Sequence, residues 1–373
     1  MSEALLHPDL WGESCLSTES SLHQLAPYIG KMKSSMAKAL IERYSSKGDL
    51  VCDPFVGSGV VALESLLGER GILASDISPY AYVLTKAKLT PPRTMEEALS
   101  KADFYCTKMK MTANGVSLRA VPKWVRSFFH PRTLKEVLAL TSLLRQKREY
   151  FLQACLLGIL HHQRPGFLSY PSSHLVPYLR TKNFPIERFP ELYKYRSVAD
   201  RLKAKINRVY KRFPRLSAAL PMECRRVNAA TAWLPKGAVD AVITSPPYMN
   251  ALDYARDNRL RLWFLGVSDY ELQDRKVPNN PKDFLILMEG CMRNVYQGLR
   301  RNGMCVLVIG EVRRSCKPIN TAQLIIEMMK NRSINLRLEE VIEDTIPDIR
   351  RARRNGSCTK KEWIVVFKKG GKA

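Results

Sequence analysis

A loop with two consecutive prolines is the part of this sequence whose residue types point most directly to chemistry. Residues 239–248 read VDAVITSPPY, an apolar run that stops at Thr244 and continues into the tetrapeptide 245–248. Because two prolines in a row cannot continue a helix or a central strand, they predict a rigid loop at the carboxyl end of a strand. The loop offers a hydroxyl group, carbonyl oxygens and an aromatic ring. These groups suit a planar base that is held by its exocyclic amine.

A glycine-rich turn earlier in the chain indicates a site for a nucleoside cofactor. Residues 49–67 read DLVCDPFVGSGVVALESLL, which predicts a strand, a turn and a helix. Gly57 and Gly59 let the backbone approach a ligand closely, and the helix N-terminus presents free N–H groups. The next strand ends at Asp76, where a carboxylate can accept hydrogen bonds from ribose hydroxyls. The turn matches neither G-x-G-x-x-G nor the P-loop, which disfavours nicotinamide and nucleoside triphosphate cofactors.

Three segments, taken together and in their order along the chain, resemble the S-adenosylmethionine-dependent DNA amino-methyltransferases, a family that methylates cytosine N4 or adenine N6. They read HQLAPYIGKMKSSMAKALIERYSSKGDLVCDPFVGSG, LLGERGILASDISPYA and TSPPY. The resemblance implies an α/β fold with a class I (Rossmann-like) methyltransferase sheet. Residues 25–90 and 222–370 would form this domain, with two closing strands near the C-terminus. Residues 1–24 would be an N-terminal extension.

The resemblance also implies which residues form the site. Ser245 with the Pro246 carbonyl would hold the target amine after base flipping, and Tyr248 would stack on the base, with Pro247 completing the catalytic loop. The amine would attack the sulfonium methyl directly, so alignment should supply most of the catalysis. The S-adenosylmethionine site would contain Lys31, Asp53, Pro54, Phe55, Gly57, Gly59, Asp76, Ile77 and Asn228.

Two positions depart from the family pattern. Val60 lies where the family often has Thr, and Asn228 lies where an acid is expected after the third strand to bind the adenine amino group. Asparagine can also bond adenine. The chain has no Pro-Cys loop, and Cys52 and Cys224 lie in strand-like runs. Methylation of cytosine C5, which needs an activated thiolate, is therefore excluded.

A strongly basic segment separates the two parts of the expected sheet. Residues 91–220 contain 25 Lys plus Arg and 8 Asp plus Glu, a net charge of +17 out of +25 for the 373-residue chain. We expect a mainly helical insert over 91–221 that recognises the target in double-stranded DNA, because Lys and Arg neutralise phosphates. In its densest stretch, apolar residues recur at helical spacing between basic ones. They are Val198, Leu202, Ile206 and Val209.

Five arginines outside the insert are also expected to contact DNA. They are Arg256, just after the proline loop, and Arg350, Arg351, Arg353 and Arg354, which lie between the two closing strands.

Composition excludes several other classes of protein. The nine cysteines include no C-x-x-C pair, which argues against a disulfide framework and against a zinc finger. No metal site is predicted, since His161, His162 and His174 have no cysteine or carboxylate beside them at ligand spacing. The longest apolar run, 156–160, is far below the roughly 18–20 residues of a membrane span, and the N-terminus does not resemble a signal peptide. We expect a cytoplasmic protein without membrane contact.

Three functions fit these observations. The preferred one is a site-specific DNA methyltransferase acting on cytosine N4, because Ser245 heads the loop where adenine enzymes of the family more often have Asp; adenine N6 is its alternative. The second keeps the reaction on an RNA base. The third is an inactive nucleic-acid-binding relative, which would have no physical need for an intact turn and loop. The recognition sequence, the oligomeric state and a cognate restriction endonuclease as partner stay open.

Overall fold

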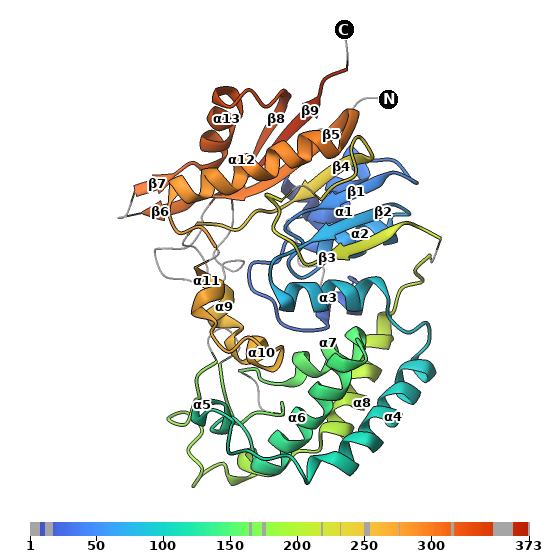
Figure 1. Cartoon of the computed structure of the whole chain (residues 1–373), viewed down its shortest axis with the longest axis vertical. Coiled ribbons are helices and arrows are strands. Elements are labelled where there is room, and N and C mark those ends of the chain that lie inside the picture. Colours follow the sequence, from blue (N-terminus) through green and yellow to red (C-terminus); the bar gives the residue numbers. More distant parts are fainter. Residues whose placement is uncertain are drawn as a thin grey trace.

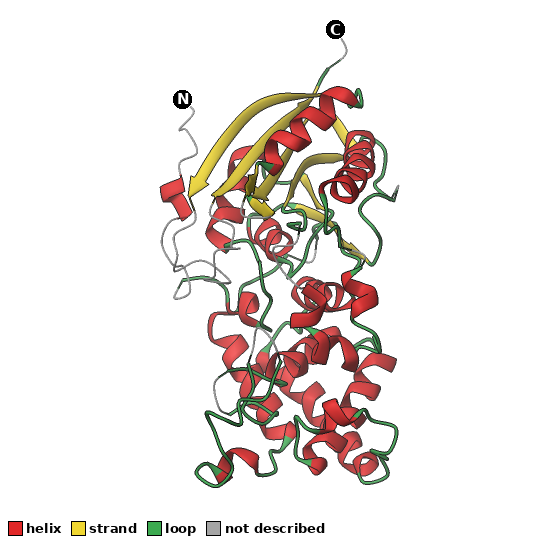
Figure 2. Cartoon of the chain, turned by 90° about the vertical axis from the view of Figure 1, so that its left-hand side faces the viewer, coloured by secondary structure: helices red, strands yellow, loops and turns green. Residues whose placement is uncertain are grey.

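The chain folds into a seven-stranded sheet with helices on both faces and a helical part beside it (Figure 1, Figure 2). The computed structural model describes residues 8–11, 18–163, 166–173, 177–217, 219–231, 233–249, 254–275, 277–314, 317–345 and 361–371. The strands are β1 (Leu50–Asp53), β2 (Gly71–Ser75), β3 (Met222–Arg225), β4 (Val239–Thr244), β5 (Leu299–Gly310), β6 (Val312–Arg314), β7 (Lys317–Ile319), β8 (Leu336–Thr345) and β9 (Lys361–Lys369). The helices are α1 (Ser34–Tyr44), α2 (Val60–Leu67), α3 (Pro79–Leu89), α4 (Met95–Ala113), α5 (Lys123–Arg126), α6 (Pro131–Gln146), α7 (Tyr150–Ile159), α8 (Val198–Val209), α9 (Tyr254–Asp257), α10 (Arg259–Phe264), α11 (Glu271–Asp274), α12 (Pro281–Gly298) and α13 (Thr321–Asn331).

The order of the strands brings the two sequence motifs together. The sheet runs β3-β2-β1-β4-β5-β9-β8, with the first five strands parallel and β9 antiparallel to both of its neighbours. Every residue of β2 is buried, as expected for a parallel strand covered on both faces. This topology confirms the predicted α/β fold with a class I methyltransferase sheet. It places the turn after β1 beside the loop after β4, at the point where the strand order reverses.

Two helical layers cover the sheet. Helices α1 and α2 pack on one face, and α12 and α13 pack on the other (Figure 1). In α12, the Asn280 side chain accepts a hydrogen bond from the Asp283 amide and so caps the helix N-terminus. Its apolar side chains recur every three or four residues on the face that is buried against the sheet. They are Phe284, Met288, Cys291 and Val295.

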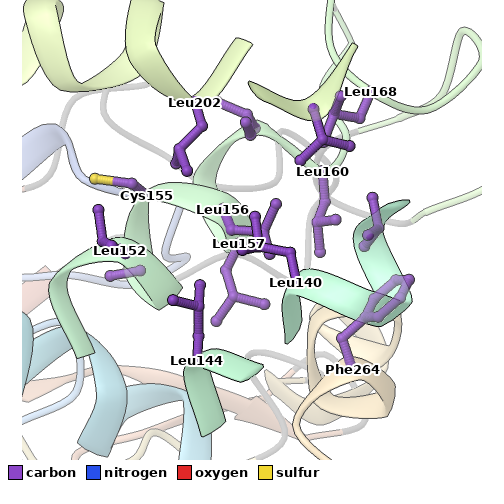
Figure 3. Packing of buried hydrophobic residues seen from close by; sticks show 14 of the residues in the cluster. Leu140, Leu144, Leu152, Cys155, Leu156, Leu157, Leu160, Leu168, Leu202 and Phe264 are labelled. Atoms are coloured by element: carbon purple, nitrogen blue, oxygen red, sulfur yellow. The ribbon is translucent and has the colours of Figure 1, made fainter. Parts of the chain in front are cut away.

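Helices α4–α8, all within residues 91–221, build a second hydrophobic core. In Figure 3, leucines of α6 and α7 meet Leu202 of α8 and Phe264 of α10. The predicted apolar face of α8 is correct, since its four residues are at most 2% exposed. Helix α3, which follows β2, and α10, which comes after the proline loop, contribute to the same core, so the helical part packs directly on elements beside the sheet.

Some basic residues of the insert support the fold through hydrogen bonds to backbone carbonyls. Lys205 is buried and its ammonium group donates to the Gln24 carbonyl at 2.7 Å. The Arg196 guanidinium donates to the carbonyls of Ser169 and Leu192. The charge available to a polyanion is therefore smaller than the sequence count. Within the ranges that the structure describes, none of the helices combines the length and the apolar character needed to cross a membrane.

Candidate active site

Two adjoining cavities open at the carboxyl ends of β1, β2 and β4. Both are lined by Tyr28, Gly30, Phe55, Gly57 and Ser245. One continues along Asp76 and Asn228 towards α9–α11, and the other continues along Lys31 and Asp53 towards the start of α2. The glycine turn and the proline loop thus form the walls of one continuous site.

The glycine turn needs its glycines for two different reasons. Gly57 has φ +51° and lies in the wall of the cavity, where an added Cβ would come within 3.3 Å of the Tyr28 ring. Gly59 has φ +75° and lies behind the wall, where a Cβ would be 2.9 Å from Thr85 Oγ1 and 3.2 Å from Thr85 Cα. Between them, Ser58 Oγ is buried with no hydrogen-bond partner among the described residues, so it can bond to a ligand.

Two carboxylates, the buried Asp53 and the partly buried Asp76, face the cavities. Asp76 accepts hydrogen bonds from the amides of Gly57 at 2.9 Å and Ser78 at 2.8 Å, while burial raises its pKa to about 6. Asp53 accepts from Thr244 Oγ1 at 2.6 Å and from the Phe55 amide at 3.1 Å, and burial raises its pKa to about 7. A ligand that brings hydroxyl donors or a positive charge would stabilise the ionised form of each carboxylate.

These groups fit S-adenosylmethionine. Its ribose hydroxyls can donate to Asp76, its sulfonium carries a positive charge that complements the carboxylates, and Phe55 offers an apolar surface. The side-chain oxygen of Asn228 accepts the Ala230 amide at 2.9 Å. This contact holds the carboxamide in the cavity wall beyond β3, where it can form hydrogen bonds with the edge of a base.

The proline loop turns its residues in different directions. Ser245 and Pro247 line the cavity, whereas Pro246 is buried. The Tyr248 hydroxyl donates to Glu362 Oε1 at 2.8 Å, and its ring packs against the sheet core. Burial and the Glu362 carboxylate raise the pKa of Tyr248 well above its usual value. Tyr248 does not line either cavity in the described residues, so its stacking on a base stays a prediction.

Most of the predicted site residues come together in this place. The structure brings into the two cavities Lys31, Asp53, Pro54, Phe55, Gly57, Asp76, Ile77, Asn228, Ser245 and Pro247. Gly59 supports the turn from behind. Arg256 lies in α9, where its amide donates to Asp274 at 3.1 Å. Arg350, Arg351, Arg353 and Arg354 lie outside the described residues.

Sequence reasoning missed several lining residues. Tyr28 forms one side of the cavity and stacks on Tyr80, with the ring centroids 5.8 Å apart. In the local sequence, the one feature that pointed to a special backbone conformation near Tyr28 was Gly30, which has φ +71°. On the opposite side lie Tyr254, Asn258 and Gln273.

Those three residues are held in place by the short helices after the proline loop. The Asn258 amide group donates to the Tyr254 carbonyl at 2.9 Å. Asp274 accepts the backbone amides of Ala255 and Arg256, which joins α11 to α9 and fixes the position of Gln273. Nothing in the local sequence distinguishes these polar residues from surface ones.

Comparison with known proteins gives a family match near the N-terminal end of the chain. Residues 28–115 match the family model described as D12 class N6 adenine-specific DNA methyltransferase. Type II methyltransferase M.BsoBI of Geobacillus stearothermophilus is 25% identical over 287 residues, which cover 68% of this chain and 54% of that protein. Type II methyltransferase M.MjaII of Methanocaldococcus jannaschii is 33% identical over 70 residues, covering 18% of this chain and 13% of its own length. The chain thus spans about half of M.BsoBI and a smaller share of M.MjaII. Among solved structures, TrmN from Thermus thermophilus is 12% identical, with a TM-score of 0.38, covering 93% of this chain and 52% of its own.

Proposed function

We propose that this chain is an S-adenosylmethionine-dependent DNA methyltransferase that acts on the exocyclic amine of a flipped base. The observation that carries the proposal is the shared cavity, which is lined by Gly57 of the glycine turn, Asp76 after β2 and Ser245 of the proline loop. The similarity to two type II methyltransferases supports a methyltransferase, and the family match over residues 28–115, whose description names DNA, supports DNA as the polymer.

The protein's own residues bind and align the two reactants. Asp76 holds the ribose, Asn228 bonds the adenine, and Asp53 lies where a carboxylate favours a positive charge. Bound S-adenosylmethionine supplies an electrophilic methyl group. Ser245, with the Pro246 carbonyl, orients the target amine so that its nitrogen lone pair points at this methyl group. The stiffness of the Pro-Pro loop limits the orientations that must be lost on binding.

We assign cytosine N4 as the target because Ser245 heads the loop. The family model that names adenine N6 covers residues 28–115 and does not reach the residues that hold the base. Adenine N6 is the second candidate, and that family description is the observation in its favour.

DNA recognition belongs to the basic helical insert in this proposal. Residues 91–220 contribute +17 to the net charge, and Arg259 next to the cavity is held between the rings of Trp124 and Tyr178, 5.2 and 4.7 Å from their centroids. The half-exposed Tyr178 ring offers a stacking surface beside that charge. Because the relatives in the comparison are type II enzymes, a cognate restriction endonuclease is part of the proposal.

Analysis of the methylated nucleosides tests the function. Purified protein is incubated with S-adenosylmethionine and mixed-sequence duplex DNA, with an RNA sample alongside, and the digested nucleosides are analysed by mass spectrometry. We expect N4-methylcytosine in DNA. N6-methyladenine would transfer the assignment to the second candidate, and methylation of RNA alone would refute DNA as the substrate. Binding of the cofactor without any product would indicate a nucleic-acid-binding relative.

A further inference from the structure

We propose that Trp124, Arg259 and Tyr178 form a stacking platform for a DNA base whose face is uncovered when its neighbour flips into the cavity. The Cζ atom of Arg259 lies 5.2 Å from the centroid of the Trp124 ring and 4.7 Å from that of the Tyr178 ring. We call these three residues the Arg259 platform. The inference rests on the proposed function and extends it to the DNA around the target base.

Contacts with the rest of the protein hold the Arg259 platform in place. The Trp124 ring packs edge to face on Phe128, which is part of the hydrophobic core, with the centroids 6.4 Å apart. Arg259 Nη2 donates to the Pro177 carbonyl at 3.3 Å. Because Pro177 directly precedes Tyr178, the same bond fixes the backbone that carries the second ring. Side chains that are ordered before the DNA arrives lose little freedom on binding.

The Arg259 platform lies beside the cavity assigned to the target base. Asn258, directly before Arg259, and Leu262, about one helical turn after it, both line that cavity. Helix α10 therefore carries part of the platform and part of the cavity wall. In Figure 1, α5, which carries Trp124, lies on the same side of the helical part as α9 and α10.

Tyr178 offers ring surface to a further planar group. The residue is 48% exposed, although the Arg259 guanidinium lies over its ring. Its hydroxyl makes no hydrogen bond to another residue of the described part of the chain. The ring, and not the hydroxyl, is therefore the group that Tyr178 presents. A base can stack on such a ring whatever its sequence, since every base has a flat aromatic face.

The charge around the Arg259 platform favours a nucleic acid as the partner. The segments 104–135 and 150–186, which supply its two rings, contain no Asp or Glu. Lys123 and Arg126 are exposed on α5, before and after Trp124. Basic side chains around an exposed ring bind the phosphates of a strand whose base stacks on the ring.

A base can stack on Tyr178 only if one of its faces is free. Inside a paired duplex, both faces of each base are covered by the neighbouring base pairs. Extrusion of one nucleotide uncovers the bases on either side of it and leaves the opposite base without a partner. Because the Arg259 platform lies beside the cavity that receives the flipped base, these are the bases that it can contact. Their stacking on Tyr178 would offset part of the cost of opening the duplex.

A second ring–cation pair in the insert provides a matched control. Phe104 on α4 is 54% exposed, and the Lys108 ammonium group lies 4.2 Å from the centroid of its ring. Neither is among the described residues that line the two cavities. Figure 1 places α4 on the opposite side of the helical part from α5. Phe104→Ala thus removes an exposed ring next to a cation without touching the Arg259 platform.

Binding of the purified protein to two DNA duplexes, measured by fluorescence anisotropy, tests the stacking. One duplex is fully paired, and the other has the same sequence with a single abasic nucleotide, which leaves the adjacent base faces free. The wild type should bind the abasic duplex more tightly. Tyr178→Ala should weaken binding to the abasic duplex about 5- to 100-fold, as expected for the loss of one base–ring stack, and should change binding to the paired duplex by less than about twofold. Tyr178→Phe, which keeps the ring, and Phe104→Ala should bind both duplexes like the wild type.

Photochemical cross-linking locates the contact. In the abasic duplex, 5-iodouracil replaces the base opposite the abasic nucleotide, and irradiation joins it to an aromatic ring that it touches. Mass spectrometry of the digested complex should identify Tyr178 as the cross-linked residue. The cross-link should disappear in Tyr178→Ala and persist in Phe104→Ala.

The outcomes keep this proposal distinct from the proposed function, because neither binding nor cross-linking requires methyl transfer. A protein that prefers the abasic duplex through Tyr178 but methylates no base would refute the function and leave the Arg259 platform in place. A methylating protein whose Tyr178→Ala variant binds the abasic duplex within about twofold of the wild type would overturn the platform. Equal losses of affinity for both duplexes, or a Tyr178→Phe variant no better than Tyr178→Ala, would also overturn it, since the ring would then not act by stacking on a base.

Discussion

Replacement of Asp53 by asparagine should stabilise the protein, and the gain should depend on pH. Asp53 is 3% exposed, and its Oδ1 accepts hydrogen bonds from Thr244 and Phe55. The carboxamide oxygen of an asparagine can accept both bonds. The substitution therefore removes the negative charge that burial disfavours and keeps the contacts. A carboxylate whose ionised form is disfavoured in the free protein is consistent with a site arranged for a positively charged ligand.

The size of the effect follows from the pKa of Asp53. Burial raises it from 3.8 to about 7. Between these values the unfolded chain has released the proton and the folded chain has kept it, so the free energy of unfolding falls as pH rises. At about 1.4 kcal/mol per pH unit, the loss reaches about 4 kcal/mol above pH 7. The carboxamide of the variant does not titrate, so Asp53→Asn should show almost no gain at pH 4 and the full gain at pH 8.

Urea denaturation at pH 5, 6.5 and 8, followed by circular dichroism, measures this gain. We expect the stability difference between variant and wild type to be about 3 kcal/mol larger at pH 8 than at pH 5. Calorimetry at pH 8 should show weaker binding of S-adenosylmethionine by the variant, because a favourable charge is gone. A difference that is constant with pH, or a variant that is less stable at pH 8, would refute the reasoning about burial.

Three further predictions concern the turn, the cofactor acid and the contact between the two parts. Gly59→Ala should lower the free energy of unfolding by about 1–3 kcal/mol in urea titrations, because it adds a close contact with Thr85 to an unfavourable φ. Gly237→Ala is the control: Gly237 has φ +66°, but the new Cβ would have no atom within 4 Å, so the loss of stability should be smaller. Equal losses in the two variants would contradict the packing argument. Asp76→Ala should weaken cofactor binding about 10- to 100-fold in calorimetry, and unchanged affinity would remove Asp76 from the site. Arg261→Met should lower the free energy of unfolding by about 2–4 kcal/mol, because the buried guanidinium donates to the carbonyls of Leu157 at 3.1 Å and His161 at 3.3 Å. Arg293, whose side chain is half-exposed, provides the control. If Arg261→Met lost no more stability than Arg293→Met, this role would be refuted.

Local sequence was sufficient for the central strands of the sheet and for the turn and the loop that line the two cavities. The buried strands β1, β2 and β4 appear as short apolar runs, and the turn after β1 appears as Gly57 and Gly59. These features depend on backbone conformation and on the periodicity of apolar residues, which neighbouring residues determine. The apolar face of α8 was predictable for the same reason. Because parallel strands align their carboxyl ends at one edge, the meeting of the turn and the proline loop also followed from the motif order.

Tertiary structure alone decided where the remaining side chains point. Tyr248 was expected on the base, yet its hydroxyl donates to Glu362, which is 114 residues away in the chain and reaches the loop only because β9 inserts between β5 and β8. Gln273 and Asn258 enter the wall of the cavity through the packing of three short helices. Lys205 and Arg196, which are counted in the net charge of residues 91–220, bond to carbonyl oxygens of other segments. For Tyr248, Lys205 and Arg196 the partner is distant in sequence, and a local pattern specifies the backbone conformation of a residue but not the atom that its side chain will meet.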